Sequence, residues 1–325
     1  MRGAGGATLL IASTGGHLEQ LVRLHRRLQP APKSVEWVTF DDPQSRSLLA
    51  GEVVHYVPYV APRSYSSVVR NIPAAERILR HGRFARIVTT GSAITLSFLP
   101  IARARGVECH FIESAARADG PSLTASLVAA LPGMRMYSQY PAWADEKWQY
   151  RGSVFDSYRP LDIEPPPGGL ARRVVVTFGT MRTYGFRRAA EALAKTLPSV
   201  LAPGATVLWQ VGVTDVSGLG LEAKTSIPAS ELKAAIAESD LVVAHAGVGS
   251  ALTSLDLGKA PVLLVRRRAH NEMVDDHQTM IAGELDRRGL GVSAEPGELT
   301  SEHLSRALAI SVEREPVGKP FLLRS

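Results

Sequence analysis

Cysteine is nearly absent from the 325-residue chain, and long apolar runs are lacking. The one thiol, Cys109, excludes an internal disulfide framework, and its place within the apolar run from Val107 to Ile112 predicts a small buried side chain. No uninterrupted apolar run reaches the ~20 residues of a membrane-spanning helix. Residues 1–12 also lack the basic segment and long apolar core of a secretory signal, so we expect a cytoplasmic protein.

Acidic residues are scarce in the N-terminal half. Residues 1–160 carry 19 Lys and Arg against 12 Asp and Glu, whereas residues 161–325 carry 18 against 19. The excess is densest between Ala61 and Gly106, where one acidic residue accompanies eight arginines, at positions 63, 70, 77, 80, 83, 86, 103 and 105. Such a patch favours an anionic partner, namely nucleic acid, an anionic membrane surface or a phosphorylated substrate. The alternative is a solvated basic face, and no recognisable nucleic-acid motif accompanies the arginines.

The length suits about two domains, each able to bury its own core. Short apolar runs typical of buried strands alternate with helical periodicity on both sides of a segment rich in proline and glycine, Leu161 to Gly169. We predict two doubly wound α/β domains, residues 1–160 and 171–325, joined by a linker over 161–170, with the last helix free to pack back on the first domain. In such sheets the parallel strands deliver their carboxyl ends to one rim, where ligands bind.

One stretch of the second domain has the pattern of a strand, a glycine turn and a helix. Leu241 to Ala244 is a short apolar run, and Gly247 and Gly249 let the backbone turn sharply and come close to a ligand. Unpaired N–H groups and the helix dipole from Val248 onward suit a diphosphate, with the Ser250 hydroxyl as a further donor. The pattern predicts a nucleotide site, and an ordinary strand-to-helix turn is the alternative.

A second glycine turn follows the first predicted strand, Ala7 to Ser13. Gly15 and Gly16 free the backbone there, and His17 stands at the start of the next helix, on the rim where open α/β sheets bind ligands. A histidine in that place can accept a proton from an attacking hydroxyl. Alternatively, His17 only caps or packs against the helix.

Polar residues follow two further strands of the first domain, Gly91 and Ser92 after one and Glu113, Ser114 and Arg117 after the other. Because parallel strands share one rim, we expect these residues beside His17. Glu113 is a second candidate base or a residue that orients His17, and its simpler role is an ion pair with Arg117.

The basic region contains a predicted amphipathic helix. Asn71 is placed to cap it, with Pro73 in its first turn, and its apolar face is formed by Ile72, Ala75, Ile78 and Leu79. The arginines lie elsewhere on the helix or before it, and we assign four to an acceptor or membrane surface: Arg63, Arg70, Arg77 and Arg80. A helix that simply packs on the sheet with exposed arginines fits the pattern equally well.

Three adjacent arginines, Arg266 to Arg268, follow the predicted strand Val262 to Val265. They are candidates to meet phosphates or an acidic sugar, while Asp276, His277 and Gln278 start the next helix, where they can bond sugar hydroxyls. A metal role for His270, Asp275, Asp276 and His277 is disfavoured, because the spacing matches no standard zinc pattern.

Six motifs in order carry a family resemblance: Thr14-Gly-Gly-His17, Phe111-Ile-Glu-Ser114, Thr177-Phe-Gly-Thr180, His245-Ala-Gly-Val-Gly-Ser250, Gly258-Lys-Ala-Pro261 and Asp275-Asp-His-Gln278. Together they resemble glycosyltransferase family 28. More narrowly, the chain is similar to the two-component bacterial exopolysaccharide and capsule glycosyltransferases, and to the eukaryotic enzyme that adds the second N-acetylglucosamine to dolichol-diphosphate, with both components fused. The resemblance extends to about Leu290. It implies the GT-B fold, two Rossmann-like domains facing a cleft.

The resemblance also implies an inverting, single-displacement sugar transfer that uses no metal or other cofactor, with a UDP-sugar as co-substrate. It places the donor on the C-terminal domain, at Gly179, Thr180, His245, Gly247, Val248, Gly249, Ser250, Thr253, Arg266, Asp276, His277 and Gln278. It places a polyprenyl-diphosphate-linked acceptor on the N-terminal domain at the inner face of the plasma membrane, at Gly15, Gly16, Arg63, Arg70, Arg77, Arg80, Gly91, Ser92, Ser114 and Arg117. Thr253 departs from the pattern, because relatives usually have a glutamate there for the ribose hydroxyls.

The sequence leaves the identity of the transferred sugar open. Arg266 to Arg268 favour a uronic acid such as glucuronic acid, whose carboxylate they would pair, over galactose, glucose or N-acetylglucosamine. Two other classes fit less well. A nucleotide-sugar 2-epimerase shares the architecture but needs no basic membrane face, and a non-catalytic nucleic-acid-binding protein explains the arginines and little else.

Overall fold

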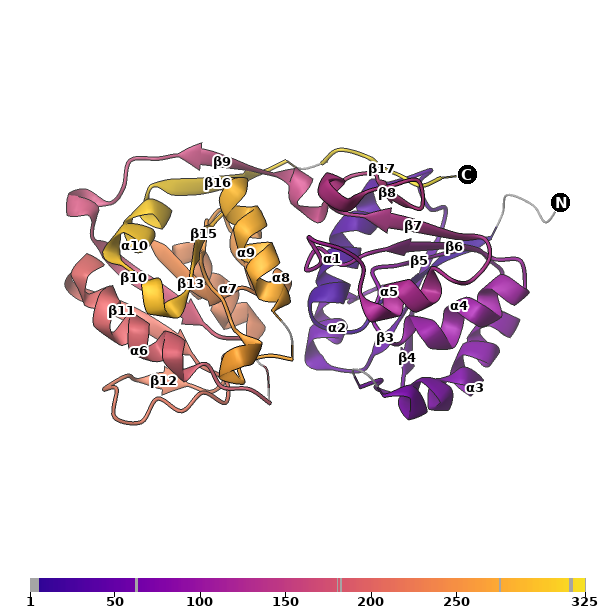
Figure 1. Cartoon of the computed structure of the whole chain (residues 1–325), viewed down its shortest axis with the longest axis horizontal. Helices are drawn as coiled ribbons and strands as arrows, with labels where there is room; N and C mark the ends of the chain where they lie inside the picture. The colour runs from indigo at the N-terminus through magenta and orange to yellow at the C-terminus, as the bar shows by residue number, and fades with distance from the viewer. Residues whose placement is uncertain are drawn as a thin grey trace. The chain divides into compact units, whose positions relative to one another are not determined.

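The computed structural model describes residues 6–61, 64–179, 181, 183–274, 276–315 and 318–324. Of the predicted site residues, Arg63 and Thr180 lie outside the described residues, as does Asp275 of the last motif. The chain divides into two compact units, unit 1 with Met1–Asp156 and Val317–Ser325, and unit 2 with Ser157–Pro316 (Figure 1). None of the described helices is long and apolar enough to span a membrane.

Unit 1 is built on a parallel sheet of seven strands in the order β4-β3-β1-β5-β6-β7-β8. Its strands are β1 (Ala7–Ile11), β2 (Leu28–Gln29), β3 (Val35–Phe40), β4 (Val54–Val57), β5 (Phe84–Thr89), β6 (Glu108–Ile112), β7 (Met134–Ser138), β8 (Trp148–Tyr150) and β17 (Phe321–Leu322). Its helices are α1 (Gly16–Leu24), α2 (Pro43–Leu48), α3 (Tyr65–His81), α4 (Thr95–Ala104) and α5 (Leu123–Val128).

Unit 2 repeats this plan with a parallel sheet of six strands in the order β12-β11-β10-β13-β14-β15. Its strands are β9 (Tyr158–Asp162), β10 (Ala171–Thr177), β11 (Leu201–Gln210), β12 (Ala223–Lys224), β13 (Leu241–His245), β14 (Val262–Leu264), β15 (Val292–Ala294) and β16 (Ile310–Arg314). Its helices are α6 (Arg187–Thr196), α7 (Ala229–Glu238), α8 (Val248–Asp256), α9 (His277–Arg287) and α10 (Ser301–Leu308).

The central strands of both sheets are buried on both faces, as their continuous apolar runs predict. Leu9, Leu10 and Ile11 of β1 are fully buried, and so are Val243 and Ala244 of β13. Parallel strands covered by helices on both sides have this composition because neither face meets water. The glycine turns after β1 and β13 therefore start from rigid, fully packed strands.

The segment predicted as a linker begins inside a strand. Leu161 and Asp162 belong to β9, which pairs antiparallel with β16, so the regular structure of unit 2 starts earlier than residue 171. The last helix, α10, lies within unit 2, where it packs against β15.

A short tail after unit 2 belongs to unit 1. Its strand β17 pairs in parallel with β2, and Phe321 is fully buried with its ring edge-to-face on Tyr137. The guanidinium of the buried Arg27 donates to the carbonyl oxygens of Lys319 and Ser153 at 2.7 Å each. Apolar burial and charge-assisted hydrogen bonds both fix the tail.

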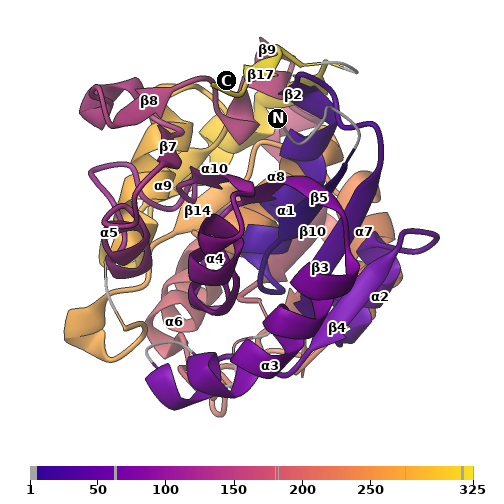
Figure 2. The same ribbon diagram turned by 90° about the vertical axis from the view of Figure 1, so that its right-hand side faces the viewer.

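The amphipathic helix of the basic region starts earlier than Asn71. Helix α3 begins at Tyr65 behind the cap Ser64 and packs beside α4, where Ser97 donates to the Val68 carbonyl (Figure 2). Asn71 is fully buried in mid-helix, and its amide donates to the carbonyl oxygen of Pro58 at 2.9 Å. The predicted cap is wrong, because this side chain holds the loop before the helix instead of the helix end.

Candidate functional site

The rim of unit 1 is formed where β1, β5 and β6 end. Gly15 caps α1 with φ 86°, a left-handed conformation that favours glycine, and its N–H donates to Oε1 of Gln44 at 2.6 Å. Gly16 opens the helix. The backbone of the first glycine turn is thus held from α2 as well as from its own strand.

His17 lies in the first turn of α1 and is half-buried. Its Nδ1 is 2.8 Å from the carbonyl oxygen of Thr90, and the Thr90 hydroxyl donates to the carbonyl oxygen of His17 at the same distance. A carbonyl oxygen can only accept, so the neutral ring carries its proton on Nδ1. Nε2 then holds the lone pair that a general base needs.

Gly91 and Ser92 form the turn directly after Thr90. Both have positive φ, 98° and 80°, and Ser92 adopts this conformation although it carries a side chain. A Cβ on Gly91 would lie 3.1 Å from Cζ of Phe111 and 3.6 Å from Cε1 of His17. The glycine therefore lets the turn pass close to the imidazole ring.

Glu113 is buried, with 1% of its surface exposed. Its two carboxylate oxygens accept separate backbone N–H groups, that of Ser114 at 2.9 Å and that of Ser122, the cap of α5, at 2.7 Å. Burial raises the pKa of Glu113, while these donors oppose the shift. Of the two candidate bases, His17 is the more accessible, and Glu113 holds the turn that leads into α5.

A buried glutamine that the sequence analysis did not single out connects the two turns of this rim. Nε2 of Gln20 donates to the Gly16 carbonyl and to Oγ of Ser114, at 2.9 and 3.1 Å. Its Oε1 accepts from the N–H of Ala115 and from the amide of Gln139. Gln20 lies one helical turn after Gly16, and a polar residue among the leucines that α1 buries was the available signal. Arg117, half-buried, follows on the same loop.

The rim of unit 2 is centred on His245, the last residue of β13. A Cβ added to Gly179 would lie 2.6 Å from Cε1 of the ring, and one added to Gly247 would lie 2.4 Å from Nε2. Real Cβ atoms do not approach so closely, so both glycines are required by the position of the ring. Gly247 was predicted to let the backbone approach a ligand and Gly179 to belong to the donor site, and here both also enclose an imidazole.

Burial, followed by the neighbouring Arg266, lowers the pKa of His245 to about 3. The ring is therefore neutral at any pH near neutrality, and it adds no positive charge to the rim. Oγ of Ser250 lies 3.4 Å from its Nδ1. The attraction for an anion comes instead from the first turn of α8, where Val248, Gly249 and Ser250 follow the cap Gly247.

Thr253 lies in the second turn of the same helix. Its hydroxyl donates to the Gly249 carbonyl at 2.9 Å, an ordinary bond within a helix. This contact gives the Thr253 hydroxyl a partner within its own helix, and threonine does not supply the carboxylate that the resemblance leads one to expect at this position.

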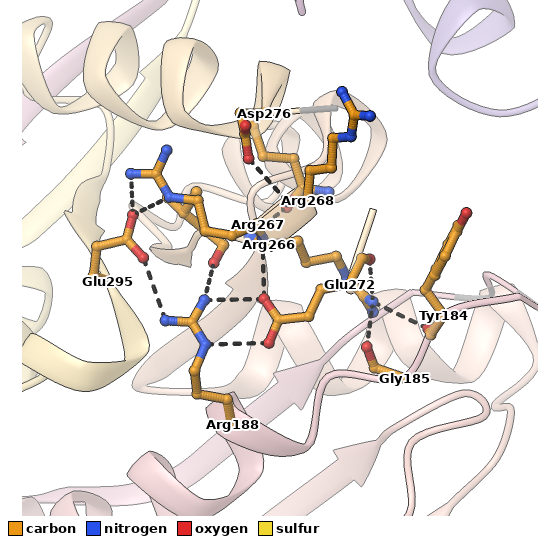
Figure 3. A network of polar contacts seen from close by, with 11 residues as sticks. Tyr184, Gly185, Arg188, Arg266, Arg267, Arg268, Glu272, Asp276 and Glu295 are labelled. Carbon is orange, nitrogen blue, oxygen red and sulfur yellow. Dashed lines mark hydrogen bonds and ion pairs between the residues drawn. The ribbon is translucent and has the colours of Figure 1, made fainter. Parts of the chain in front are cut away.

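Arg266 has a structural role that differs from the predicted contact with a donor. Its side chain is 1% exposed and its guanidinium donates to four backbone carbonyls, those of Phe178, Tyr184, Gly185 and Glu272, at 3.0 to 3.3 Å (Figure 3). It also lies 4.7 Å above the Phe186 ring. Burial lowers the pKa of Arg266 to about 10, which leaves it charged. This arginine fixes the loop after β10 from inside.

Arg267 is likewise engaged within the unit. Its guanidinium pairs with Glu295, which also accepts from Arg188, and Arg188 in turn pairs with the buried Glu272 at 2.9 Å (Figure 3). Burial of opposite charges is tolerated when each has several partners. Of the three adjacent arginines, Arg268 is the one whose side chain is exposed.

The residues at the start of α9 are divided between structure and surface. Gln278 is buried, and its Oε1 accepts the N–H of Arg266 at 3.1 Å. Asp276 is exposed, and its Oδ1 accepts the N–H of Arg268 at 2.9 Å. His277, half-buried, is close enough to contribute to the lowered pKa of His245. Among the described residues of this motif, Asp276 and His277 are therefore the ones that reach the surface.

The basic region separates into internal and surface arginines. Arg86 is buried against Thr8 and the Pro30 carbonyl, Arg103 donates to two backbone carbonyls, and Arg105 pairs with Glu76. Among the described residues of this region, four arginines are exposed: Arg70, Arg77, Arg80 and Arg83. Arg70, Arg77 and Arg80 are on α3, and the same helix carries an exposed apolar row formed by Tyr65, Val69 and Ile72, with exposed fractions of 61%, 61% and 40%.

Comparisons with known proteins agree with this architecture. Residues 174–315 match the model of the glycosyltransferase family 28 C-terminal domain. The chain is similar to the UDP-N-acetylglucosamine–N-acetylmuramyl-(pentapeptide) pyrophosphoryl-undecaprenol N-acetylglucosamine transferase of Trichodesmium erythraeum (strain IMS101), at 23% identity over 313 residues, 91% of this chain and 81% of the relative.

A shorter stretch, 58 residues or 18% of this chain, is 40% identical to the UDP-N-acetylglucosamine transferase subunit ALG13 of Yarrowia lipolytica (strain CLIB 122 / E 150), of which it covers 28%. Among solved structures, MurG of Acinetobacter baumannii matches with a TM-score of 0.57 at 16% identity, over 92% of this chain and 89% of that one. The likeness in structure shows a shared GT-B fold, with a parallel sheet in each unit as predicted.

Proposed function

We propose that this chain, whose residues 174–315 match the glycosyltransferase family 28 C-terminal domain, is a glycosyltransferase that moves a sugar from a UDP-sugar to a polyprenyl-diphosphate-linked saccharide during exopolysaccharide or capsule biosynthesis. The observation that carries the proposal is the rim of unit 2, where two glycines enclose a neutral histidine at the N-terminus of α8. The names of the Trichodesmium and Yarrowia relatives, both UDP-N-acetylglucosamine transferases, support the choice of nucleotide.

The donor's diphosphate binds at the first turn of α8, where backbone N–H groups lack helical partners. The same groups stabilise the charge that develops on UDP as it departs, so they contribute more in the transition state than in the ground state. Because this stabilisation needs no metal, the proposed reaction should proceed in the presence of a chelator. Turnover lost with EDTA and restored by a divalent cation would contradict that part.

On unit 1, the acceptor hydroxyl gives its proton to Nε2 of His17 as its oxygen attacks the anomeric carbon, which inverts in a single displacement. The Nδ1 contact with the Thr90 carbonyl supports this role, because it sets the tautomer that a base requires. The turns at Gly15–Gly16, Gly91–Ser92 and Ser114 surround the same place on the rim and would meet the acceptor's diphosphate and first sugar.

The identity of the sugar is best decided by experiment. Glucuronic acid was favoured by three adjacent arginines, but Arg266 and Arg267 are engaged within unit 2, and Arg268 alone remains exposed to pair with a carboxylate. A donor panel of UDP-glucuronic acid, UDP-galactose, UDP-glucose and UDP-N-acetylglucosamine, read by thermal shift, should single out one sugar. UDP release should then require a polyprenyl-diphosphate-linked saccharide. Conversion of a donor to its 2-epimer without acceptor would replace this proposal with the epimerase.

The exposed row Tyr65, Val69 and Ile72 and the neighbouring arginines of α3 favour attachment to an anionic membrane. Residues at i, i+4 and i+7 lie on one side of a helix, so the three apolar side chains can enter the interface while Arg70, Arg77 and Arg80 meet lipid phosphates. At about 1 kcal/mol per arginine, changing all three to Glu should weaken binding to anionic vesicles by about two orders of magnitude or more.

A matched control reverses three exposed lysines of unit 2, at positions 195, 224 and 233, which changes the net charge by the same amount. If the lysine triple weakens sedimentation with vesicles as much as the arginine triple does, attachment depends on net charge and α3 is not the binding face. Undiminished sedimentation of the arginine triple would show that these arginines do not hold the protein on the membrane.

A further inference from the structure

Thr90 and His17 hold each other by two hydrogen bonds that run in opposite directions. The imidazole donates from Nδ1 to the Thr90 carbonyl, and the Thr90 hydroxyl donates to the His17 carbonyl, each over 2.8 Å. Thr90 is fully buried, whereas His17 is half-buried at the rim. One inaccessible residue therefore fixes both the backbone and the ring of an accessible one.

We propose that Thr90 is the positioning residue for the reaction of unit 1: it sets the tautomer and the orientation of His17. The inference rests on the proposed function, in which Nε2 of His17 takes the acceptor's proton. An imidazole without a fixed partner samples two tautomers and two ring orientations, and only some of them present a lone pair to the acceptor. The Thr90 carbonyl selects one of them.

The backbone around Thr90 explains why its carbonyl keeps this direction. The hydroxyl of the buried Thr89 accepts the N–H of Gly91 at 3.0 Å, and the turn continues through two residues of positive φ. The Cβ of any residue other than glycine at position 91 would crowd Phe111. A strained conformation that the surroundings impose is typical of a functional turn. Here it points one carbonyl oxygen at one ring nitrogen.

The hydrogen bond from Nδ1 of His17 to the Thr90 carbonyl contributes most while the sugar is being transferred. The acceptor oxygen forms its bond to the anomeric carbon, the bond from that carbon to the UDP oxygen breaks, and UDP departs with the electron pair. The acceptor's proton passes to Nε2, so the ring becomes an imidazolium. Its Nδ1–H bond to the Thr90 carbonyl then becomes charge-assisted and stronger, which stabilises the transition state more than the ground state.

The hydroxyl of Thr90 can be removed without a change of shape. In Thr90→Val the carbonyl of His17 loses its donor, and we expect kcat to fall roughly 10- to 100-fold, by analogy with the loss of a group that orients a metal-ligating histidine. The KM for the UDP-sugar should stay unchanged, because the donor's contacts lie in unit 2. Thr90→Ser keeps the hydroxyl and should restore most of the turnover.

Thr39→Val is the matched control. Thr39 is a fully buried threonine of the same sheet, in β3, and its hydroxyl has no hydrogen-bond partner among the described residues. The substitution should leave kcat as in the parent protein. If Thr39→Val lowers kcat as much as Thr90→Val does, the effect comes from disturbing the sheet and the proposal is wrong.

A measurement on the unaltered protein tests the tautomer directly. Nitrogen-15 NMR should show the neutral ring of His17 protonated on Nδ1 in the parent protein and also in Thr90→Val, because valine keeps the backbone carbonyl that accepts from Nδ1 and removes only the hydroxyl that holds the His17 backbone. A parent ring protonated on Nε2 overturns the proposal even if Thr90→Val does not fold. If His17→Ala abolishes turnover while Thr90→Val matches the parent, Thr90 does not position His17, but His17 is still the general base. If His17→Ala retains turnover, His17 is not the general base, and that part of the proposed function is wrong.

Discussion

His17 of unit 1 and His245 of unit 2 stand in nearly the same local pattern and have different surroundings. Each lies next to a glycine turn between a buried strand and a helix. Both side chains are half-buried, and the ring of His17 is oriented by a neutral carbonyl oxygen. His245 is held between two glycines beside a buried arginine, and its pKa is lowered to about 3.

The difference shows that the position of a histidine on a rim does not decide its chemistry. A proton acceptor has to exchange protons near neutral pH and be reached by the substrate. The surroundings of His245 remove the first property, since a ring with so low a pKa is protonated only in strong acid. His245 can shape a pocket, but it is a poor base, and the two rims can therefore divide the work between binding and proton transfer.

The largest expected effect tests the half of the comparison that concerns catalysis. His17→Ala should lower turnover by about 10² to 10⁴-fold, as general-base loss does, and leave UDP affinity nearly unchanged. Single-turnover kinetics with calorimetry of UDP binding separates the two quantities. Near-parental turnover in His17→Ala would show that His17, like His245, is not the general base.

Gly247→Ala tests the enclosed histidine. The new Cβ would lie 2.4 Å from Nε2 of His245, so the ring has to move. Overpacking of this kind costs about 1 to 3 kcal/mol, and we expect calorimetry to show UDP affinity lower by roughly 5- to 150-fold. Gly283→Ala in α9 is the control, because its Cβ meets nothing within 4 Å and alanine favours the helix. Equal UDP affinity in the two variants would move the nucleotide away from Gly247.

Glu113→Gln separates a structural carboxylate from a rival base. The glutamine amide would face a backbone N–H in place of an oxygen, whichever way it is turned, so one buried donor loses its partner. We expect a loss of stability of about 1 to 3 kcal/mol in urea unfolding, with little change in turnover at a temperature where the variant is folded. A stable variant with no turnover would transfer the role of base from His17 to Glu113.

The smallest effect concerns pH. Between about pH 3 and pH 6.5, His245 is protonated in the unfolded chain but neutral in the folded protein. This residue therefore lowers the free energy of unfolding as the pH falls through that range, and it has no effect above it. His245→Asn should reduce the slope of unfolding free energy against pH, by up to about 1.4 kcal/mol per pH unit. The comparison is urea unfolding at pH 5 and pH 7. An unchanged slope would mean that the ring is not enclosed in solution.

The parallel strands were the most predictable part of the fold, because their signal is local. The predicted runs Leu241–Ala244 and Val262–Val265 each differ by one residue from the observed strands, Leu241–His245 and Val262–Leu264. The pair β9 and β16 was missed, since its two strands are far apart in sequence and neither has a strong apolar pattern. Asn71 and Pro73 both favoured a helix start, but burial of Asn71 overrode the local preference.

The site was predictable only as far as residue type and place on a strand determine it. The glycine turns and His17 could be predicted in this way, because each is recognised by its residue type and its place after a strand. The role of Arg266 does not, because its partners are carbonyls of residues 178, 184 and 185, which only the folded chain brings to the guanidinium. Gln20 has the same property: its amide joins turns that lie far apart in sequence.

The tail strand β17 has a consequence for the order of synthesis. A ribosome produces residues 1–156 first, then the whole of unit 2, and only afterwards Phe321, which fills a buried place against Tyr137. Unit 1 therefore cannot complete its packing while it is the only part that has emerged. A fragment cut at residue 160 would expose the surface that Phe321 covers and would leave a guanidinium, that of Arg27, without its Lys319 acceptor.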